Sequence, residues 1–383
     1  GASLVEYGVV VALVAAAGLS AVGQLGGDLS QLFMDAAIKV EEVSIDPDAF
    51  ALEISADAFT LYPMVGGAIE VDWGNDAANE TCGQSFTAGA PVSCVYPSFD
   101  TYLVAVTGNM TAYGDEAGAS TNDAITRIVQ WGNTGLYWLE NAFDGARNLV
   151  DVPDHLPPGT GSLAAAFRNA SSLNDPDIAN WDTSNVTSFS YTFSGASRLN
   201  VDISSWDTSS AINMHAMFSD ASRFNADIGG WDVRDVYTME GMFRRATSFN
   251  QDLDNWDVSS VSLFEGMFKD GNFNGSLSSW NTSSATDMRN MFLRNPSFNQ
   301  DISGWDVSSV SMFTSMFEEA TAFSHDLSGW DVGGATEMTQ MFRFAANFTS
   351  DLSSWCVSAI PSRPSAFSSG SGMAVEPIWG TCP

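Results

Sequence analysis

A single glutamate lies near the start of an otherwise uncharged, apolar stretch. Glu6 is the only charged side chain before Asp28 in the chain of 383 residues. A desolvated carboxylate without a partner costs several kcal/mol in a membrane or in a protein core. The position of Glu6 therefore indicates a specific role.

Cysteines provide the second chemical signal. The chain has 4 of them, and cysteine pairs are typical of an oxidising, extracytoplasmic compartment. Three connectivities are open, of which short sequence separation favours Cys82 with Cys94 and Cys356 with Cys382. We expect the first pair to close a loop and the second to hold a C-terminal cap, residues 356–383. Neither a Cys-x-x-Cys pair nor a histidine cluster indicates zinc.

Asparagine and aspartate recur at a fixed interval along much of the chain. If successive repeats stack, their amides would satisfy backbone groups at bends, and the aspartates would form side-chain turns with the main chain. The alternative is that stacked carboxylates bind Ca²⁺, which prefers oxygen ligands; no calcium-binding motif supports it, and no other cofactor is expected. The columns are Asn200, Asn225, Asn250, Asn274 and Asn299; Asp227, Asp252, Asp301, Asp326 and Asp351; and Asp207, Asp232, Asp257, Asp306 and Asp331.

Composition argues against nucleic-acid binding and against catalysis. The formal net charge is -32, and the only lysines are Lys39 and Lys269, so no basic patch for nucleic acid is expected. His155, His215 and His325 are scattered, and none accompanies a nucleophile or metal motif. Pairs of carboxylates arise by chance in so acidic a chain. The sequence therefore predicts a protein that is not an enzyme.

Residues 7–27 form an apolar stretch that is long enough, as a helix, to cross a bilayer core of ~30 Å. The stretch has no polar face, so a helix there must be buried in lipid or among copies of itself. After Gly27 the apolar residues follow helical spacing, and Pro47 ends the pattern. The sequence predicts one long hydrophobic helix over residues 1–44, membrane-spanning before assembly.

The string GASLVEYGVVVALVAAAGLSAVGQLG resembles the Flp/Fap class of Tad-like type IVb pilins, in which a Glu-Tyr pair precedes an apolar helix rich in small residues. The resemblance covers about the first 30 residues. It implies processing by a prepilin peptidase at Gly1 and Ala2, storage in the inner membrane, and assembly by the pilus machinery into a helical homopolymer. Glu6 would pair with the free α-amino group of a neighbouring subunit; the alternative is a tolerated glutamate in a plain membrane anchor. The residues expected to serve filament assembly are Glu6, Tyr7, Val10, Leu13, Val14 and Leu25.

The apolar period changes to two between residues 45 and 124. Residues 50–54, 69–73 and 102–106 alternate apolar with polar or small side chains, and glycines bound them. The pattern is similar to that of PKD-like domains. A small β-sandwich is predicted for residues 45–124.

An internal repeat occupies residues 125–355. From Trp181 onward, tryptophans recur every 25 residues, with one interval of 24. Residues 298–302 alternate like a strand, whereas the apolar residues of 312–320 suit one or two helical turns. One such unit cannot bury its apolar residues alone, so stability must come from stacking. The repeats resemble bacterial surface-protein repeats related to the BspA-type leucine-rich family, which implies an extracellular, adhesive surface protein.

These segments predict a multi-domain α+β protein: a long N-terminal hydrophobic helix, a small PKD-like β-sandwich, and a leucine-rich-repeat-like β/α solenoid. We expect a structural pilin subunit of an extracellular pilus, which displays the solenoid to a host, cell-surface or abiotic ligand. Two alternatives remain at this point. One is a minor or tip pilin that carries an adhesin, and the other is a membrane-anchored binding module that does not polymerise.

Overall fold

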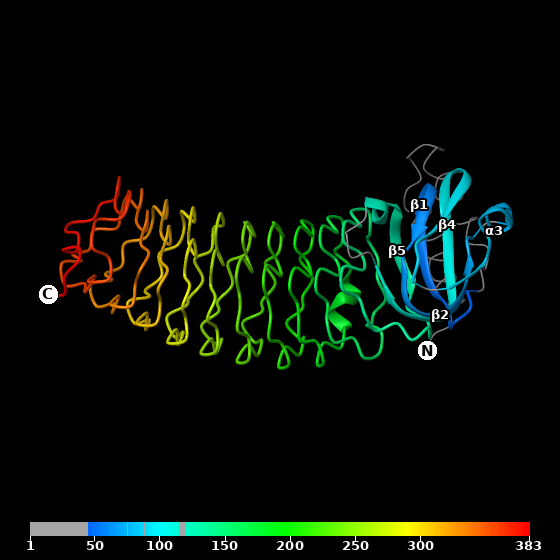
Figure 1. The fold of residues 1–383 in the computed structure, drawn as a ribbon, viewed down its shortest axis with the longest axis horizontal. Coiled ribbons are helices and arrows are strands. Elements are labelled where there is room, and N and C mark those ends of the chain that lie inside the picture. Colours follow the sequence, from blue (N-terminus) through cyan, green and yellow to red (C-terminus); the bar gives the residue numbers. More distant parts are fainter. Residues whose placement is uncertain (1–44, 75, 88, 115–119) are drawn as a thin grey trace, which may run out of the picture. The chain divides into compact units, whose positions relative to one another are not determined.

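The computed structural model describes residues 45–74, 76–87, 89–114 and 120–383 (Figure 1). Residues 48–383 form one compact unit. Within the described part, no helix is long and apolar enough to cross a membrane. The helix predicted for residues 1–44 lies outside the described residues, as do all the processing and assembly positions: Gly1, Ala2, Glu6, Tyr7, Val10, Leu13, Val14 and Leu25.

The predicted α+β fold class is wrong. The described residues contain one α-helix, α3 (Asp76–Cys82, 7 residues), and two 3-10 helices, η1 (Ser120–Ala124) and η2 (Pro176–Asn180). A long hydrophobic helix is not among these elements. Strands and turns make up the rest of the described chain, so its architecture is an antiparallel sheet followed by a solenoid built from turns.

The first part of the unit is a single antiparallel sheet, which corrects the prediction of a sandwich. Its strand order is β3-β2-β4-β1-β5. The long strand β4 pairs with both β1 and β2, and it therefore joins into one sheet the strands that a sandwich would divide between two layers. The strands are β1 (Phe50–Leu61), β2 (Pro63–Asp72), β3 (Ser85–Thr87), β4 (Val92–Tyr113) and β5 (Ile125–Gln130).

The alternating residues found in the sequence pack one face of this sheet. Phe50, Leu52 and Ile54 of β1 are buried, whereas Glu53 and Ser55 are only partly covered; the small Ala51 is buried as well. This is the pattern expected when successive side chains of a strand point to opposite faces. The register of β1 against β4 shifts between Ala56 and Ala58, which is typical of a bulge that bends a sheet.

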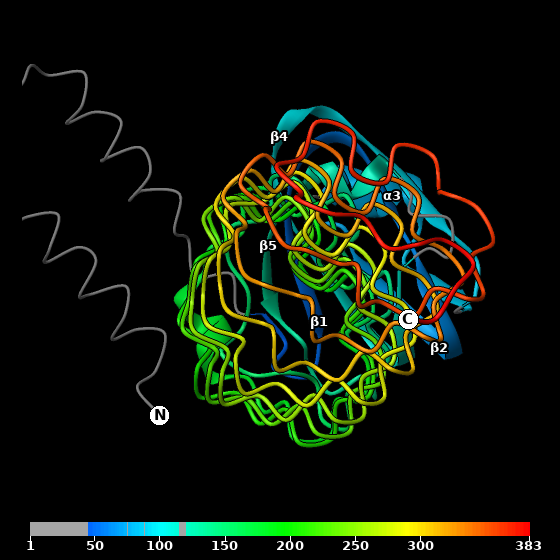
Figure 2. The same cartoon turned by 90° about the vertical axis from the view of Figure 1, so that its left-hand side faces the viewer.

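Beyond the sheet the chain forms stacked coils, which superimpose when viewed from one end (Figure 2). Neighbouring coils are joined by parallel bridges of one residue each, such as Met312 with Glu337. The segment predicted as a strand, residues 298–302, has no strand structure. The β/α pattern of a leucine-rich repeat is therefore absent from these coils.

The predicted helical turns in residues 312–320 are also wrong, and the backbone shows why. Ser315 and Glu319 have left-handed φ values of 55° and 61°, which a right-handed helix cannot contain. Met316 N and Ala320 N bond to carbonyls three residues earlier, whereas Phe317 N bonds to Met341 O of the next coil at 2.8 Å. The N–H groups are thus divided between turns within a coil and bonds between coils.

Aromatic side chains form the core of the stack. The rings of Trp206 and Trp231 lie 6.2 Å apart at an angle of 2°, and those of Phe218 and Phe243 lie 5.9 Å apart. Each repeated tryptophan also donates its indole N–H to a carbonyl of the preceding coil, for example Trp206 Nε1 to Ile178 O at 3.0 Å. The other donors are Trp181, Trp231, Trp256, Trp280, Trp305, Trp330 and Trp355.

The sheet and the first coil share one core. The ring of Phe143 lies 5.4 Å from that of Tyr113 and 6.0 Å from that of Trp131. Trp131 Nε1 donates to His155 O at 2.5 Å. Strand β5 pairs with β1 and also forms a bridge from Arg127 to Asp151, so it belongs both to the sheet and to the start of the solenoid.

Candidate functional site on the solenoid surface

The repeated asparagines form a continuous hydrogen-bonded ladder, as predicted. The side-chain oxygen of each accepts from the backbone N–H of its counterpart in the next coil, at 2.9 Å from Asn250 N to Asn225 Oδ1. The ladder ends where Ser324 N donates to Asn299 Oδ1 at 3.0 Å. Each amide thus satisfies a backbone donor that stacking alone leaves without a partner. The remaining members are Asn174, Asn200 and Asn274.

The repeated aspartates close side-chain turns, again as predicted. Asp207 Oδ1 accepts from Ser209 N at 3.0 Å and from Ser209 Oγ at 2.6 Å. These hydrogen bonds, that of the side chain first, lower the pKa of the Asp207 carboxyl because they stabilise its charged form. The same cause lowers the pKa of Asp182, Asp202, Asp257, Asp301 and Asp306.

The Ca²⁺ alternative gains no support from the aspartate columns. Among the described residues, no group of three or more His, Cys, Asp or Glu side chains is arranged to hold a metal ion. The carboxylates are instead bonded to the main chain of their own turns, for example Asp306 Oδ1 to Ser308 N at 3.0 Å.

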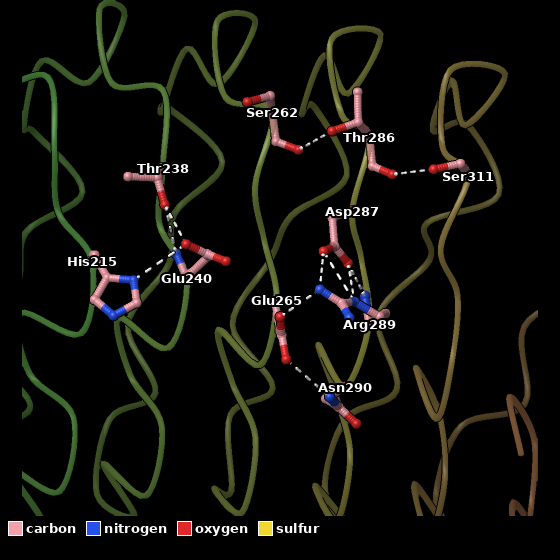
Figure 3. A network of polar contacts seen from close by, with 10 residues as sticks. All are labelled: His215, Thr238, Glu240, Ser262, Glu265, Thr286, Asp287, Arg289, Asn290 and Ser311. Atoms are coloured by element: carbon pink, nitrogen blue, oxygen red, sulfur yellow. Dashed lines mark hydrogen bonds and ion pairs between the residues drawn. The ribbon is translucent and has the colours of Figure 1, made fainter. Parts of the chain in front are cut away.

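A polar network that the sequence did not predict crosses several coils beside the bridges (Figure 3). His215 Nδ1 lies 3.3 Å from Glu240 Oε2, and Thr238 Oγ1 donates to the same oxygen at 3.2 Å. On its other side, His215 Nε2 lies 2.6 Å from the hydroxyl of Tyr191. Arg168 lies over the Tyr191 ring at 6.0 Å. The side chains of Arg168, Tyr191, His215 and Glu240 come from successive coils and form one connected row.

The row continues with an arginine held between two carboxylates. Arg289 Nη2 donates to Glu265 Oε2 at 2.9 Å and to Asp287 Oδ2 at 2.7 Å. Its hydrogen bond with Asp287, whose side chain is only 3% exposed, raises the pKa of the Arg289 guanidinium. Arg289 and Glu265 are partly exposed, so the arrangement fixes charges on a surface.

A second polar surface lies along the residues that have a left-handed backbone near the end of the turn segment in each coil. These residues form a column from coil to coil, and we call the column, together with the residues within three positions of it, the left-handed edge. Arg245 pairs with Asp220 at 3.3 Å and Asp270 at 3.7 Å, and Arg294 pairs with Asp270 at 2.5 Å. Charges therefore alternate in sign from coil to coil. The column is Gly145, Asn169, Gly195, Asp220, Arg245, Asp270, Arg294, Glu319, Phe344 and Gly370.

Four further cations on this edge have no such pairing. Within the described chain, the side chains of Arg198, Arg223, Arg244 and Lys269 contact neither a carboxylate nor a hydrogen-bond acceptor. Nε of Arg244 is buried. Burial lowers the pKa of Lys269; the neighbouring Asp270 carboxylate acts in the opposite direction, and the positive charges of Arg244, Arg294 and Arg245 lower the pKa further.

The left-handed edge ends in a shallow hollow of about 560 Å³ beside a partly exposed aromatic ring. Phe344 is 46% exposed, and the Arg343 guanidinium lies 4.8 Å from its ring centre. Charges of both signs border the hollow, which is lined by Arg294, Pro296, Glu319, Thr321 and Phe344.

The cysteines predicted as partners are bonded to each other. Cys82 of α3 is linked to Cys94 of β4, and Cys356 is linked to Cys382. Sequence reasoning identified these pairs and the two ladders, but it missed the His215 row and the pairing along the left-handed edge. Both features lie at positions that are equivalent from repeat to repeat but whose residue type changes. One such set of positions is Ser190, His215, Glu240, Glu265 and Arg289.

Comparison with known proteins identifies the repeat. A family model described as a Mycoplasma protein of unknown function, DUF285, matches residues 161–280 and also residues 268–376. Together these ranges span more than half of the chain. No curated protein and no solved structure shows significant similarity to it. The resemblance seen in the repeats is thereby supported, whereas the match does not extend to the N-terminal segment.

Proposed function

The chain belongs to the DUF285 family of Mycoplasma proteins of unknown function, and we propose that it is the structural subunit of an extracellular filament that displays the solenoid for surface interaction. In this proposal the apolar N-terminal segment joins the copies, and residues 48–383 face the outside. The proposed filament is a Tad-like pilus, and in this proposal the inner membrane holds the subunit before assembly.

The observation that carries the proposal is the separate, complete core of residues 48–383. The buried cluster of this unit runs without interruption from Phe50 in the sheet to Phe367 near the C-terminus. The apolar run of residues 7–27 precedes this unit in the sequence and carries one carboxylate. In our proposal, this apolar run is buried first in lipid and, after assembly, among neighbouring subunits.

Display outside the cell agrees with the chemistry of the unit. Both disulfides are formed in its two end regions, and such bonds persist in oxidising compartments. The turns are closed by charged aspartates that face water, such as Asp207 and Asp306. A coil stack of this kind is a stiff spacer, because every coil is bonded to both of its neighbours.

The experiment that tests the proposal replaces Glu6 with alanine in the native host. If Glu6 pairs with the α-amino group of an adjoining subunit, Glu6→Ala abolishes filaments in the sheared surface fraction, as seen by electron microscopy and immunoblotting. The matched control is Glu42→Ala, which removes a carboxylate beyond the apolar run and should leave filament yield unchanged.

The cellular location of the unsubstituted protein distinguishes the proposed function from the two alternatives. Uniform filaments composed of this chain support the proposal. Labelling confined to filament tips indicates a minor pilin that carries an adhesin. A chain found only in the membrane fraction indicates a binding module that does not polymerise, and either of these two outcomes contradicts the proposal.

A further inference from the structure

The four unpaired cations of the left-handed edge lie on successive coils. Arg198 and Arg223 occupy one column, and Arg244 and Lys269, in the next two coils, occupy a second column four positions earlier in the repeat. Arg198 and Arg223 are exposed. We call these four side chains the basic row. It is a concentration of unpaired positive charge in a chain whose net charge is -32.

A row of carboxylates with the same repeat lies on another turn of most coils, and Asn281 takes this position in one of them. In Asp207 and Asp257, Oδ1 is occupied by the N–H two residues later, at 3.0 Å and 3.1 Å. Their Oδ2 atoms accept no hydrogen bond from the described residues, and both side chains are exposed. We call this column the acidic edge; its exposed members are Asp182, Asp207, Asp257, Asp306 and Asp331.

One coil cannot bring its own two rows together. The acidic edge follows the left-handed residue by about half of the 25-residue repeat, as Asp232 follows Asp220. In a closed coil, half a repeat corresponds to the far side. The two rows of one molecule therefore face away from each other, and neither can neutralise the other.

A second copy offers a partner with matched spacing. The basic row places one charge on each of four successive coils, and Asp182, Asp207, Asp232 and Asp257 do the same on the acidic edge. The same bridges set the distance between coils, so the two spacings along the stack are identical. Neighbouring strands joined by such bridges lie ~4.8 Å apart. Each cation of the basic row can thus meet a carboxylate of the acidic edge when two solenoids lie side by side.

We propose that two copies of this chain associate laterally, with the basic row of one docked on the acidic edge of the other. The contact is independent of the N-terminal segment and adds sideways cohesion to whatever joins the copies end to end. Each exposed ion pair is weak, but pairs on successive coils act together when copies are held near one another. Carboxylates of the second copy then neutralise the unpaired cations of the basic row.

The test compares two single substitutions that remove the same charge from different sides of one coil. Arg223 and Arg234 are both exposed, and serine occupies their columns elsewhere, at Ser248 and Ser259. We expect Arg223→Ser to weaken self-association about threefold to fivefold, in line with the loss of one exposed ion pair. Arg234→Ser removes the partner of Asp232 on the acidic edge, so association should stay unchanged or tighten.

Self-association is measured by analytical ultracentrifugation of the full chain in a non-ionic detergent at one fixed ionic strength. All proteins carry Glu6→Ala, so that the result is independent of assembly through the N-terminal segment. The variant Arg198→Ser/Arg223→Ser/Arg244→Ser/Lys269→Ser should be monomeric where the parent associates. Circular dichroism and urea unfolding verify that every variant is folded.

Equal weakening by Arg223→Ser and Arg234→Ser would show that only net charge matters, and would overturn the proposal. So would a fourfold variant that associates like its parent. If the parent stays monomeric but binds dextran sulfate in a manner that Arg223→Ser weakens, the basic row serves an anionic polysaccharide and the proposal is wrong.

Discussion

The individual polar residues of the repeat complete the hydrogen bonding of the backbone. Stacking of turns leaves N–H groups at the bends, and the chain supplies one side-chain oxygen for each, from asparagine between coils and from aspartate within them. Such bonds cost little to form because the acceptor is already in place in the neighbouring repeat. Identical residues therefore recur for reasons of hydrogen bonding, and no ligand is needed to explain them.

Substitution of one ladder asparagine should destabilise the stack measurably. Asn250→Ala removes the acceptor of Asn274 N, which is bonded at 2.6 Å, and should lower the free energy of unfolding by about 1 kcal/mol. Urea unfolding followed by tryptophan fluorescence gives the value. The control, Asn255→Ala, changes an exposed amide of the same repeat whose side chain forms no hydrogen bond with the described residues. Equal losses in the two variants would contradict the role of the ladder.

The turn aspartates predict how stability depends on pH. Hydrogen bonds from serine lower the pKa of Asp207, Asp257 and Asp306 in the folded state, below the unfolded value of about 3.9. Their contribution is fully present above that unfolded value and is lost as pH falls through the folded pKa. The melting temperature should therefore drop as pH decreases below about 4.

Substitution of these aspartates by asparagine removes the charge but keeps a side-chain oxygen that can close the turn. Asn281 already fills the position in one coil, where its Oδ1 accepts from Ser283 N at 3.2 Å. The variant Asp207→Asn/Asp257→Asn/Asp306→Asn should keep the turns. Its melting temperature should fall less between pH 4 and pH 2 than that of the parent. Asp235→Asn, at an exposed carboxylate that accepts no hydrogen bond from the described residues, serves as the control. A steep acid transition that persists in the triple variant would refute the assignment.

At the scale of elements, the two ends of residues 48–383 are covered differently. The sheet covers the first coil and shares its core through Trp131 and Phe143. At the other end, residues 356–383 cover the last coil, where Val357 N bonds to Thr381 O at 2.9 Å. A solenoid needs such caps because its terminal coils would otherwise expose apolar surface.

The Cys356–Cys382 disulfide should stabilise the C-terminal cap alone. Its two cysteines are 26 residues apart, and closure of a loop of this size is worth about 3 kcal/mol. In Cys356→Ser/Cys382→Ser, the amide of Val357 should exchange with deuterium much faster, whereas that of Phe218, bonded to Met242 O in the middle of the stack, should not change. Cys82→Ser/Cys94→Ser controls for loss of a disulfide elsewhere. Faster exchange of Phe218 in the cap variant would show that the effect is global.

The sequence predicted the elements whose chemistry is local. The turn aspartates, the asparagine ladder and the alternating residues of β1 are visible because one residue type repeats with one spacing. The helical turns were mispredicted because residues 312–320 carry their apolar side chains at helical spacing and still bury them as turns. No glycine marks the left-handed backbone at Arg294 or Glu319, so the usual signal was missing.

Two other features depend on contacts that no local pattern records. The single sheet follows from β4, whose 22 residues exceed the usual strand length of about 3–10, so that one strand serves two neighbours. The row of Tyr191, His215 and Glu240 uses three residue types, and Tyr191 comes from the column next to that of His215 and Glu240. Only the stacking of coils brings them together, and the sequence alone gives no reason to compare them.

For the molecule as a whole, the described coils are held together by ring stacking and hydrogen bonds between each coil and its two neighbours. Trp206 contacts Trp181 and Trp231, and the same ring-to-ring stacking continues along the chain. Stability is then a sum of coil and interface contributions. The number of coils is free to vary, provided that each column stays in register.

Removal of one complete repeat tests this directly. Deletion of residues 207–231 joins Trp206 to Asp232, which restores the natural Trp-Asp step and keeps every column aligned. We expect a folded, cooperatively unfolding protein whose urea m-value falls in proportion to the surface lost. Deletion of residues 207–218 removes about half a repeat and places the asparagine ladder opposite the wrong turn, so this variant should be cleaved rapidly by protease. If the whole-repeat deletion is cleaved as rapidly, stability does not come from neighbouring coils alone.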